Sequence, residues 1–284
     1  MKPPWQLTHR QLNSGALTLA HCPRCHGKGT YTAKIPRLTG DDLSIVETQQ
    51  HIACDCLQRA RDLLVQANLP PGRFATAALG DLDWRAIQPP QAARMIQRYI
   101  DRLQPALQRG LGLALTGSVG TGKTHIAIGL IRLACALGIE ARFHVTPDLL
   151  AQLRATYHPR HNHRPPQSDT TILHQLAAIP LLALDDLGVE KPTDWTRDRL
   201  YTLINHRYLA QRPTIITANQ TLPTLAGRLG QRITSRLIGT TLQIHLENKD
   251  HRPHWREHTL DQIGLGWQDI WTHPTNDPQR KENP

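Results

Sequence analysis

The sequence lacks any long apolar segment. No window approaches the roughly 18 uncharged apolar residues that a membrane-spanning helix needs. The N-terminal run Met-Lys-Pro-Pro-Trp-Gln is not followed by the apolar stretch of a secretory signal. Mean hydropathy is −0.43, and no internal repeat is visible. We therefore set aside a membrane protein, a secreted disulfide scaffold and a fibrous protein, and we expect a cytoplasmic protein without a membrane partner.

A basic tail is also missing, although the chain as a whole is basic. It carries 33 Lys and Arg against 23 Asp and Glu, which gives a formal net charge of +10. The excess is spread along the chain instead of being gathered in one arm. This balance favours a polyanion such as nucleic acid over a merely solvated basic surface. Any DNA site must then be assembled by folding or by several subunits together.

The length of 284 residues suggests about two domains. Cysteines are concentrated near the N-terminus, and proline pairs at Pro70-Pro71 and Pro89-Pro90 punctuate the region that follows. We divide the chain into a leader, a cysteine module, a linker, a core and a tail whose end frays, at residues 1–16, 17–60, 61–73, 74–247 and 248–284.

Short apolar runs alternate with helical periodicity in the expected core. One helical face carries Ile126, Leu130 and Leu133, and another carries Leu200, Leu203, Ile204 and Tyr208. Strands alternating with helices predict an α/β fold with a parallel sheet covered on both faces. The expected strands are Leu111–Thr116, Ala141–Val145, Pro180–Leu184, Thr214–Ala218 and Thr241–Leu246.

The most specific motif is a phosphate-binding loop that follows the first of these strands and opens a helix. Its glycines let the backbone N–H groups surround a phosphate, and the helix N-terminus adds a favourable dipole. Lys123 is expected to reach the β- and γ-phosphates of ATP, and the Thr124 hydroxyl is expected to bind Mg²⁺. The loop consists of Gly117, Ser118, Val119, Gly120, Thr121, Gly122, Lys123 and Thr124.

Two further strands end in polar side chains. The run Leu181-Leu182-Ala183-Leu184 is followed by Asp185, the expected Mg²⁺ partner, and by Asp186, placed to orient or deprotonate the attacking water. Asn219 follows the strand Thr214–Ala218, and strand C-termini line the ligand crevice of a parallel sheet. Asn219 is therefore a candidate contact of the γ-phosphate or the water, although an ordinary turn asparagine is the alternative.

Two arginines lie on one face of a predicted helix. Arg232 and Arg236 are four residues apart and far from the phosphate loop in sequence. An arginine that reaches the γ-phosphate of a neighbouring subunit stabilises the transition state of hydrolysis. A solvated basic face explains the same spacing.

Four cysteines form the pattern of a metal site. Cys22 and Cys25 are spaced C-x-x-C, Cys54 and Cys56 are spaced C-x-C, and four thiolates suit tetrahedral Zn²⁺. Extended runs at residues 30–37 and 45–53 lie between the pairs and suggest a small zinc ribbon. The alternatives are disulfides, free thiols, or histidine ligands from His21, His26 and His51. The nearly neutral module has a single aromatic, Tyr31, which favours docking to a protein over reading DNA.

The motif order resembles the AAA+ ATPases of the DnaC/DnaI-like helicase-loader family and their relatives, the IstB-like transposition helpers. The resemblance is carried by the phosphate loop and by the runs LLALDDLG, TIITANQ and RLGQRITSRL, and it extends from about Phe74 to Arg252. It implies a P-loop AAA+ core with a five-stranded parallel sheet. It further implies a homo-oligomer with ATP at its subunit interfaces and single-stranded DNA inside a ring or spiral.

The same resemblance gives roles to individual residues. Asn219 becomes the sensor, Arg236 the favoured arginine finger and Arg232 the second choice. Relatives often continue into a helical lid, which we do not expect in the short sequence after Leu246.

The function predicted from these features is the ATP-dependent loading of a replicative helicase onto single-stranded DNA, with the zinc module docked on the helicase. The alternative is an IstB-like helper ATPase that remodels target DNA and recruits a transposase. A module that binds ATP without hydrolysing it is disfavoured by the complete set of phosphate-loop and carboxylate residues.

Overall fold

In the computed structural model of this chain, residues 4–13, 18, 21–39, 44–157, 168–248 and 250 are described. Side chains are not described at residues 13, 35–39, 44–46 and 48. Of the expected tail, only Asn248 and Asp250 belong to the described part. The expectations of a frayed end and of a missing lid therefore lie outside the described residues.

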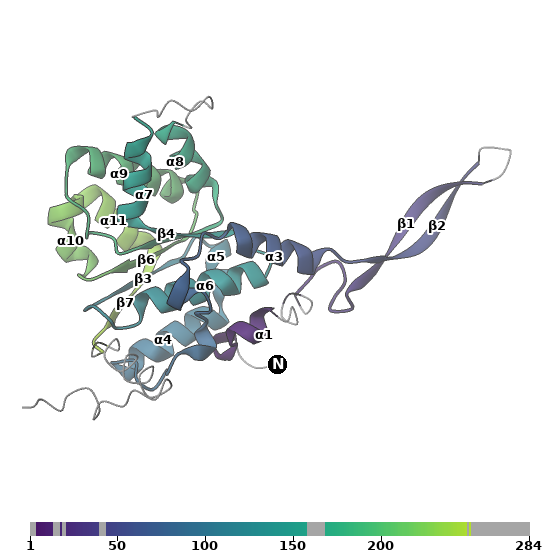
Figure 1. The fold of residues 1–284 in the computed structure, drawn as a ribbon, viewed down its shortest axis with the longest axis horizontal. Helices are drawn as coiled ribbons and strands as arrows, with labels where there is room; N and C mark the ends of the chain where they lie inside the picture. Colours follow the sequence, from purple (N-terminus) through teal and green to yellow (C-terminus); the bar gives the residue numbers. More distant parts are fainter. Residues whose placement is uncertain are drawn as a thin grey trace, which may run out of the picture.

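The centre of the molecule is a five-stranded parallel sheet with the strand order β4-β5-β6-β3-β7 (Figure 1). This confirms the predicted α/β fold class. The bounds differ from the expected ones by no more than one residue at either end of any strand. The strands are β3 Gly112–Gly117, β4 Ala141–Val145, β5 Leu181–Asp185, β6 Thr214–Ala218 and β7 Thr241–Leu246.

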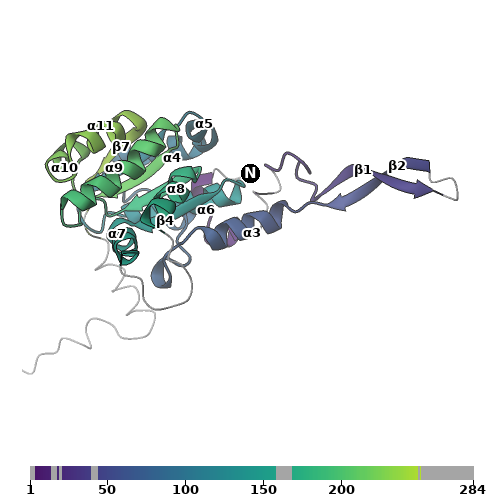
Figure 2. The same ribbon diagram turned by 90° about the horizontal axis from the view of Figure 1, so that it is seen from above.

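Helices cover both faces of the sheet (Figures 1 and 2). Against one face lie α1 His9–Asn13, α3 Cys56–Gln66, α4 Pro90–Asp101, α5 Leu103–Gln108 and α6 Lys123–Ala136. Against the other lie α7 Thr146–Ala155, α8 Asp169–Ala178, α9 Asp194–Leu209, α10 Leu222–Leu229 and α11 Gln231–Thr240. Short 3-10 turns occur at Pro4–Gln6, Gly72–Phe74 and Leu79–Asp81.

The period-two alternation of the strands divides the core into two hydrophobic clusters. In β3, Leu113 and Leu115 join the cluster around α6, whereas Ala114 between them joins the cluster around α8 and α9. Because both faces are buried, the strands read as continuous apolar runs, as expected of a parallel sheet. The expected helical face on α9 is buried at Leu200, Leu203 and Ile204. Tyr208, assigned to that face from periodicity, is instead 45% exposed.

A two-stranded arm projects from this core (Figures 1 and 2). Its strands β1 Thr30–Thr39 and β2 Ser44–Ala53 pair antiparallel, with Thr30 opposite Ala53 and Thr39 opposite Ser44. They contain the two extended runs predicted between the cysteine pairs. The next helix, α3, crosses the expected boundary between residues 60 and 61 and packs against α6.

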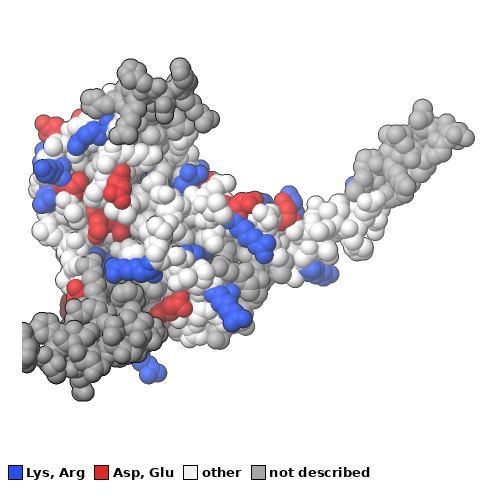
Figure 3. Space-filling model, viewed as in Figure 1, with Lys and Arg blue, Asp and Glu red and all other residues white. Residues whose placement is uncertain are grey.

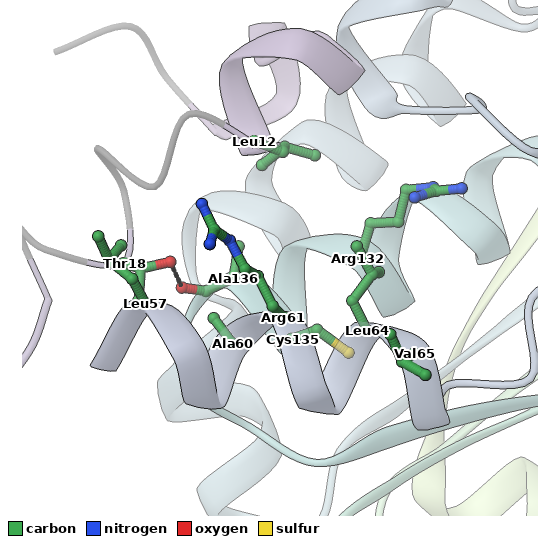
Figure 4. Close-up of a pocket in the computed structure, with 10 residues that line it drawn as sticks. All are labelled: Leu12, Thr18, Leu57, Ala60, Arg61, Leu64, Val65, Arg132, Cys135 and Ala136. Atoms are coloured by element: carbon green, nitrogen blue, oxygen red, sulfur yellow. Dashed lines mark hydrogen bonds between the residues drawn. The ribbon is translucent and has the colours of Figure 1, made fainter. Parts of the chain in front are cut away.

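The arm meets the core beside a small cavity of about 290 Å³ between α3 and α6 (Figure 4). One stripe of α3, at Leu57, Ala60 and Leu64, lines it. The Thr18 hydroxyl donates to the backbone oxygen of Ala136 over 2.7 Å and ties the segment after α1 to the end of α6. The arm is therefore connected to the core through packed helices.

Basic and acidic side chains alternate on the face shown in Figure 3, without a single patch of one sign. The spread of charge inferred from the sequence is thus visible on this face. Among the helices of the described part, none has the length and apolar character to cross a membrane.

Candidate functional site

The phosphate loop connects β3 to α6. Gly117, Gly120 and Gly122 all have positive φ, and α6 begins at Lys123. A Cβ atom on Gly117 would come within 2.1 Å of the backbone oxygen of Leu246 on the adjacent strand. Glycine is therefore required at position 117 by both the backbone angle and the available space.

Lys123 turns back into this loop. Its ammonium group donates to the backbone oxygens of Gly117 and Ser118 over 2.8 and 2.6 Å. The Lys123 side chain is buried, so its positive charge is held inside the loop, where the phosphate oxygens of a nucleotide would bind. This is the geometry needed to neutralise the β- and γ-phosphates of a nucleotide.

Asp185 lies at the end of β5 and is hydrogen-bonded to residues of α6 and β6. Its carboxylate accepts hydrogen bonds from the hydroxyls of Thr124 over 3.0 Å and Thr217 over 2.5 Å. Burial raises the pKa of Asp185 to about 6, and the neighbouring Asp186 charge adds to the rise, while the Thr217 hydrogen bond opposes it. A buried carboxylate next to a threonine hydroxyl is an oxygen donor pair that fits Mg²⁺.

Asp186 and Asn219 line the same cavity as the phosphate loop, and its volume is about 450 Å³. Asp186 has a positive φ of 55°, and its N–H donates to the Thr217 hydroxyl over 2.9 Å. The structure thus gathers Lys123, Thr124, Asp186 and Asn219 around one space. Asp185 lies directly behind it, against Thr124.

Sequence reasoning missed several residues of this site. Arg73 and Phe74 line the cavity from the turn before the core, and the Arg73 guanidinium lies 4.9 Å from the centre of the Phe74 ring. His125 lines it from α6 and hydrogen-bonds the backbone oxygen of Ala78. No motif marks Arg73 and Phe74, and only their place after the proline pair could have drawn attention. Thr217 is hidden in an ordinary apolar strand.

The two candidate arginine fingers are not among the residues that line this cavity. Arg236 hydrogen-bonds Asn205 on α9, over 2.9 Å. Arg232 lies one turn earlier on α11 and is exposed. Within the described residues, neither arginine of the expected pair lines the site, and the role of an arginine finger stays a prediction.

The four cysteines of the module come together. Their sulfur atoms all lie within 4.8 Å of one another, with Cys22 and Cys54 at 3.6 Å and Cys25 and Cys56 at 3.9 Å. Four sulfurs about 2.3 Å from one Zn²⁺ in a tetrahedron are about 3.8 Å apart, so the cluster fits this ion. None of the cysteines forms a disulfide.

Backbone amides order the Cys22–Cys25 half of the cysteine cluster as a turn. The N–H groups of His26 and Lys28 donate to the backbone oxygens of Cys22 and Cys25, over 3.0 and 2.9 Å. His51, one of the alternative ligands, instead has its Nδ1 3.4 Å from the Thr32 hydroxyl. The cluster found among the described residues consists of cysteines alone.

Comparison with known proteins places this geometry in context. The model of the family "IstB-like ATP binding protein" matches residues 40–245. An ATP-binding protein in an insertion sequence of Mycobacterium tuberculosis is 28% identical over 233 residues, which cover 80% of this chain and 89% of that protein. The replicative helicase loader DnaI of Bacillus subtilis is 28% identical over 136 residues, which cover 47% and 42% of the two chains.

A solved structure shows the same fold. The crystal structure titled DnaI aligns with a TM-score of 0.53 at 24% sequence identity. The alignment covers 64% of this chain and 94% of the DnaI chain.

Proposed function

The chain belongs to the IstB-like family of AAA+ ATP-binding proteins, and from this premise we propose that it hydrolyses ATP at contacts between its own subunits to control assembly on DNA. One observation carries the proposal. Four residues expected to bind and activate a triphosphate line one cavity and Asp185 lies behind it against Thr124, whereas both arginines expected to complete the reaction lie elsewhere on the chain.

The proposed chemistry follows from the positions of the side chains. Lys123 releases its backbone carbonyls and pairs with the β- and γ-phosphates. Thr124 and Asp185 hold Mg²⁺, which when bound neutralises charge on the phosphate oxygens. Asp186 accepts the proton of the attacking water, and Asn219 orients that water against the γ-phosphate.

The neighbouring subunit supplies the remaining positive charge. We place this role on Arg236, with Arg232 as the second choice, because both lie on α11, away from the chain's own phosphate loop. Hydrolysis then depends on subunit contact, so assembly and turnover are coupled. The net charge of +10 supports DNA as the surface on which the subunits assemble.

The test is phosphate release with and without single-stranded DNA. Arg236→Ala is expected to bind ATP normally, while its kcat for hydrolysis falls at least about a thousandfold. This is the low end of the factor that an arginine finger contributes to kcat. Normal turnover of this variant would refute the role of Arg236. Normal turnover of Arg232→Ala as well would refute the interface mechanism.

For the cellular role, we favour a helper ATPase of a transposable element. The insertion-sequence relative matches 80% of this chain, which is well beyond the expected core at residues 74–247, whereas the loader matches 47%. The similarity to that relative therefore includes segments outside the ATPase core. The partner in this case is a transposase, with target DNA as the substrate of remodelling.

Loading of a replicative helicase is the second candidate, and the cysteine module is the observation that favours it. We infer that the four cysteines hold Zn²⁺ and that the arm docks on a protein partner. Co-purification separates the two roles when the tagged chain is offered the transposase of its own element and the replicative helicase of its host. Retention of the helicase alone would overturn the transposition role.

A further inference from the structure

Arg236 is enclosed by the side chains of one helical stripe. Tyr201, Asn205 and Tyr208 follow each other at intervals of four and three residues on α9, so they lie on the same face of that helix. Arg236 extends from α11 onto this face. Its guanidinium lies 5.0 Å from the centre of the Tyr201 ring and 5.5 Å from that of Tyr208. We call these three α9 side chains the arginine cradle.

Hydrogen bonds fix the guanidinium in the cradle. Its Nε donates to the Asn205 side-chain oxygen over 2.9 Å, and one terminal nitrogen reaches the Tyr201 hydroxyl over 3.3 Å. The other terminal nitrogen donates to the backbone oxygen of Arg232 over 2.9 Å. A flexible side chain is thereby held in one arrangement from three directions.

Every partner in the cradle is uncharged. In the part of the chain that the structure describes, Arg236 makes its contacts with two tyrosines, an amide and a backbone carbonyl, and none with a carboxylate. Aromatic faces and neutral oxygens attract a guanidinium while leaving its positive charge uncompensated. A carboxylate partner would form a charge-assisted pair that has to break before the arginine could meet a phosphate.

The cradle also remains accessible. Arg236 itself is half-buried, and Tyr208 beside it is 45% exposed. An arginine serving only to join α9 and α11 would be expected to sit deeper between them, as Arg207 does between α8 and β6 with 1% exposure. The difference between these two arginines indicates that Arg236 is held at the surface for use.

We propose that Tyr201, Asn205 and Tyr208 are positioning residues that hold Arg236 in one rotamer with its charge unpaired, ready for the γ-phosphate of a neighbouring subunit. This inference rests on the proposed function, because it acts through the arginine finger. It adds that the α9 stripe, which takes no part in nucleotide binding, sets the turnover rate. Binding of ATP is then independent of the cradle.

The decisive variant is Asn205→Asp in the full chain. Asparagine and aspartate have nearly the same shape, so the substitution places a carboxylate 2.9 Å from the Arg236 Nε without creating a cavity. We expect kcat for phosphate release to fall about tenfold while ATP affinity and the melting temperature stay equal or rise. If the cradle only joined the two helices, the stronger pair would leave kcat unchanged, and that result would overturn the inference.

Ring variants provide the second measurement. Tyr201→Leu with Tyr208→Leu removes both aromatic faces and is expected to lower kcat about a hundredfold, because misplacing a catalytic group by about 1 Å costs that much. The double Tyr→Phe variant at the same two positions retains both aromatic rings, and its kcat is expected to lie within about threefold of the wild-type value. Equal loss in both double variants would also overturn the inference.

Two controls separate the possible failures. Thr202→Ala alters the residue next to Tyr201 and should leave kcat unchanged. Among the described residues, the hydrogen bond of the Thr202 hydroxyl is to the backbone oxygen of Asp198 on its own helix. Arg236→Ala tests the proposed function itself. If Arg236→Ala turns over normally, the finger assignment fails. If it is inactive and the cradle variants are normal, only the cradle inference fails.

Discussion

The ATPase core and the cysteine arm are stabilised in different ways. The core buries both faces of its sheet in two hydrophobic clusters, with leucine and isoleucine side chains that are almost inaccessible to solvent. The arm is a two-stranded hairpin that stands away from the core, and a lone hairpin is at best marginally stable in water. The arm is anchored at its base by the cluster of four cysteines.

This difference has a functional consequence. A rigid core can hold Lys123, Asp185 and Asn219 in fixed positions relative to each other because they lie at the ends of β5 and β6 and at the start of α6, which are locked by packing. An arm with little core can change its orientation or its partner without disturbing the nucleotide site. Independent perturbation of the two regions is therefore the direct test of the comparison.

The largest expected effect is on the arm, from the double substitution Cys22→Ser with Cys25→Ser. Loss of two thiolates should abolish zinc binding, because structural zinc contributes about 10–16 kcal/mol to modules of this kind. Metal analysis should show one zinc per wild-type chain and none in the variant, and proteases should cut the arm faster. ATP affinity should stay within about twofold.

The matched control is Cys135→Ala, because Cys135 is buried in α6 and apart from the cluster. It should retain one zinc per chain while lowering the stability of the core. Retention of zinc by the Cys22/Cys25 variant, or collapse of its ATP affinity, would contradict the separation of the two regions.

In the core, the nucleotide site is tested by Lys123→Ala. Loss of the ammonium group that faces the phosphates should lower ATP affinity at least about a hundredfold, equivalent to about 2.7 kcal/mol. Titration with a fluorescent ATP analogue measures this loss, and circular dichroism should report an intact fold. The arm control is Lys34→Ala, whose exposed pair with Glu47 is worth at most about 1 kcal/mol and should not affect the nucleotide. Unchanged ATP affinity in Lys123→Ala would refute the phosphate-loop assignment.

Arg207→Leu should destabilise the core by about 3–5 kcal/mol. The buried guanidinium donates to the backbone oxygens of Leu176, Ile179 and Pro213 and to the Thr214 hydroxyl, and all four lose their donor in the variant. Urea unfolding measures the change. Zinc content should not respond, and a variant as stable as wild type would show that these carbonyls find other partners.

The smallest expected effect is a gain in stability from Asp185→Asn. The folded state raises the pKa of Asp185 to about 6, from 3.8, so the folded chain binds more protons than the unfolded chain between about pH 4 and 6. Stability from this group is greatest below that window and is lost as the pH rises through about 6. The neutral amide of Asp185→Asn has no charge to bury, so the free energy of unfolding should rise by about 1–3 kcal/mol at pH 7.5 in the absence of nucleotide.

Thermal unfolding of wild type and Asp185→Asn at pH 5 and pH 7.5 checks this sign. The difference between the melting temperatures of the two proteins should be smaller at pH 5 than at pH 7.5. A variant that is less stable at pH 7.5 would show that hydrogen bonds from Thr124 and Thr217 outweigh the burial of the charge.

Much of the ATP site could be predicted from the sequence, for a physical reason. The phosphate loop is contiguous, and a strand that ends in Asp185-Asp186 must open at the same sheet edge once the strands are parallel. Thr217 could not be predicted, because its contact with Asp185 depends on β5 and β6 being neighbours. Arg73 and Phe74 were missed because they reach the cavity from a short turn at the N-terminal edge of the core, where no motif marks them.

The arginine cradle also could not be predicted from the sequence, because it depends on contacts between two helices. Periodicity assigned Tyr208 to the buried face of α9, yet its ring is partly exposed, and Arg236 of α11, which packs against α9, lies over it. The spacing of Arg232 and Arg236 fixed a shared helical face without saying which of them would be held.

By itself, the sequence determined what short-range chemistry can specify: apolar periods that make strands and helices, glycines that admit a phosphate, and paired cysteines suited to one metal ion. The tertiary structure alone decided which distant side chains meet, such as Thr217 with Asp185 and the α9 tyrosines with Arg236. Such meetings depend on how helices and strands far apart in the chain pack, and packing energies are summed over many weak contacts that no local pattern encodes.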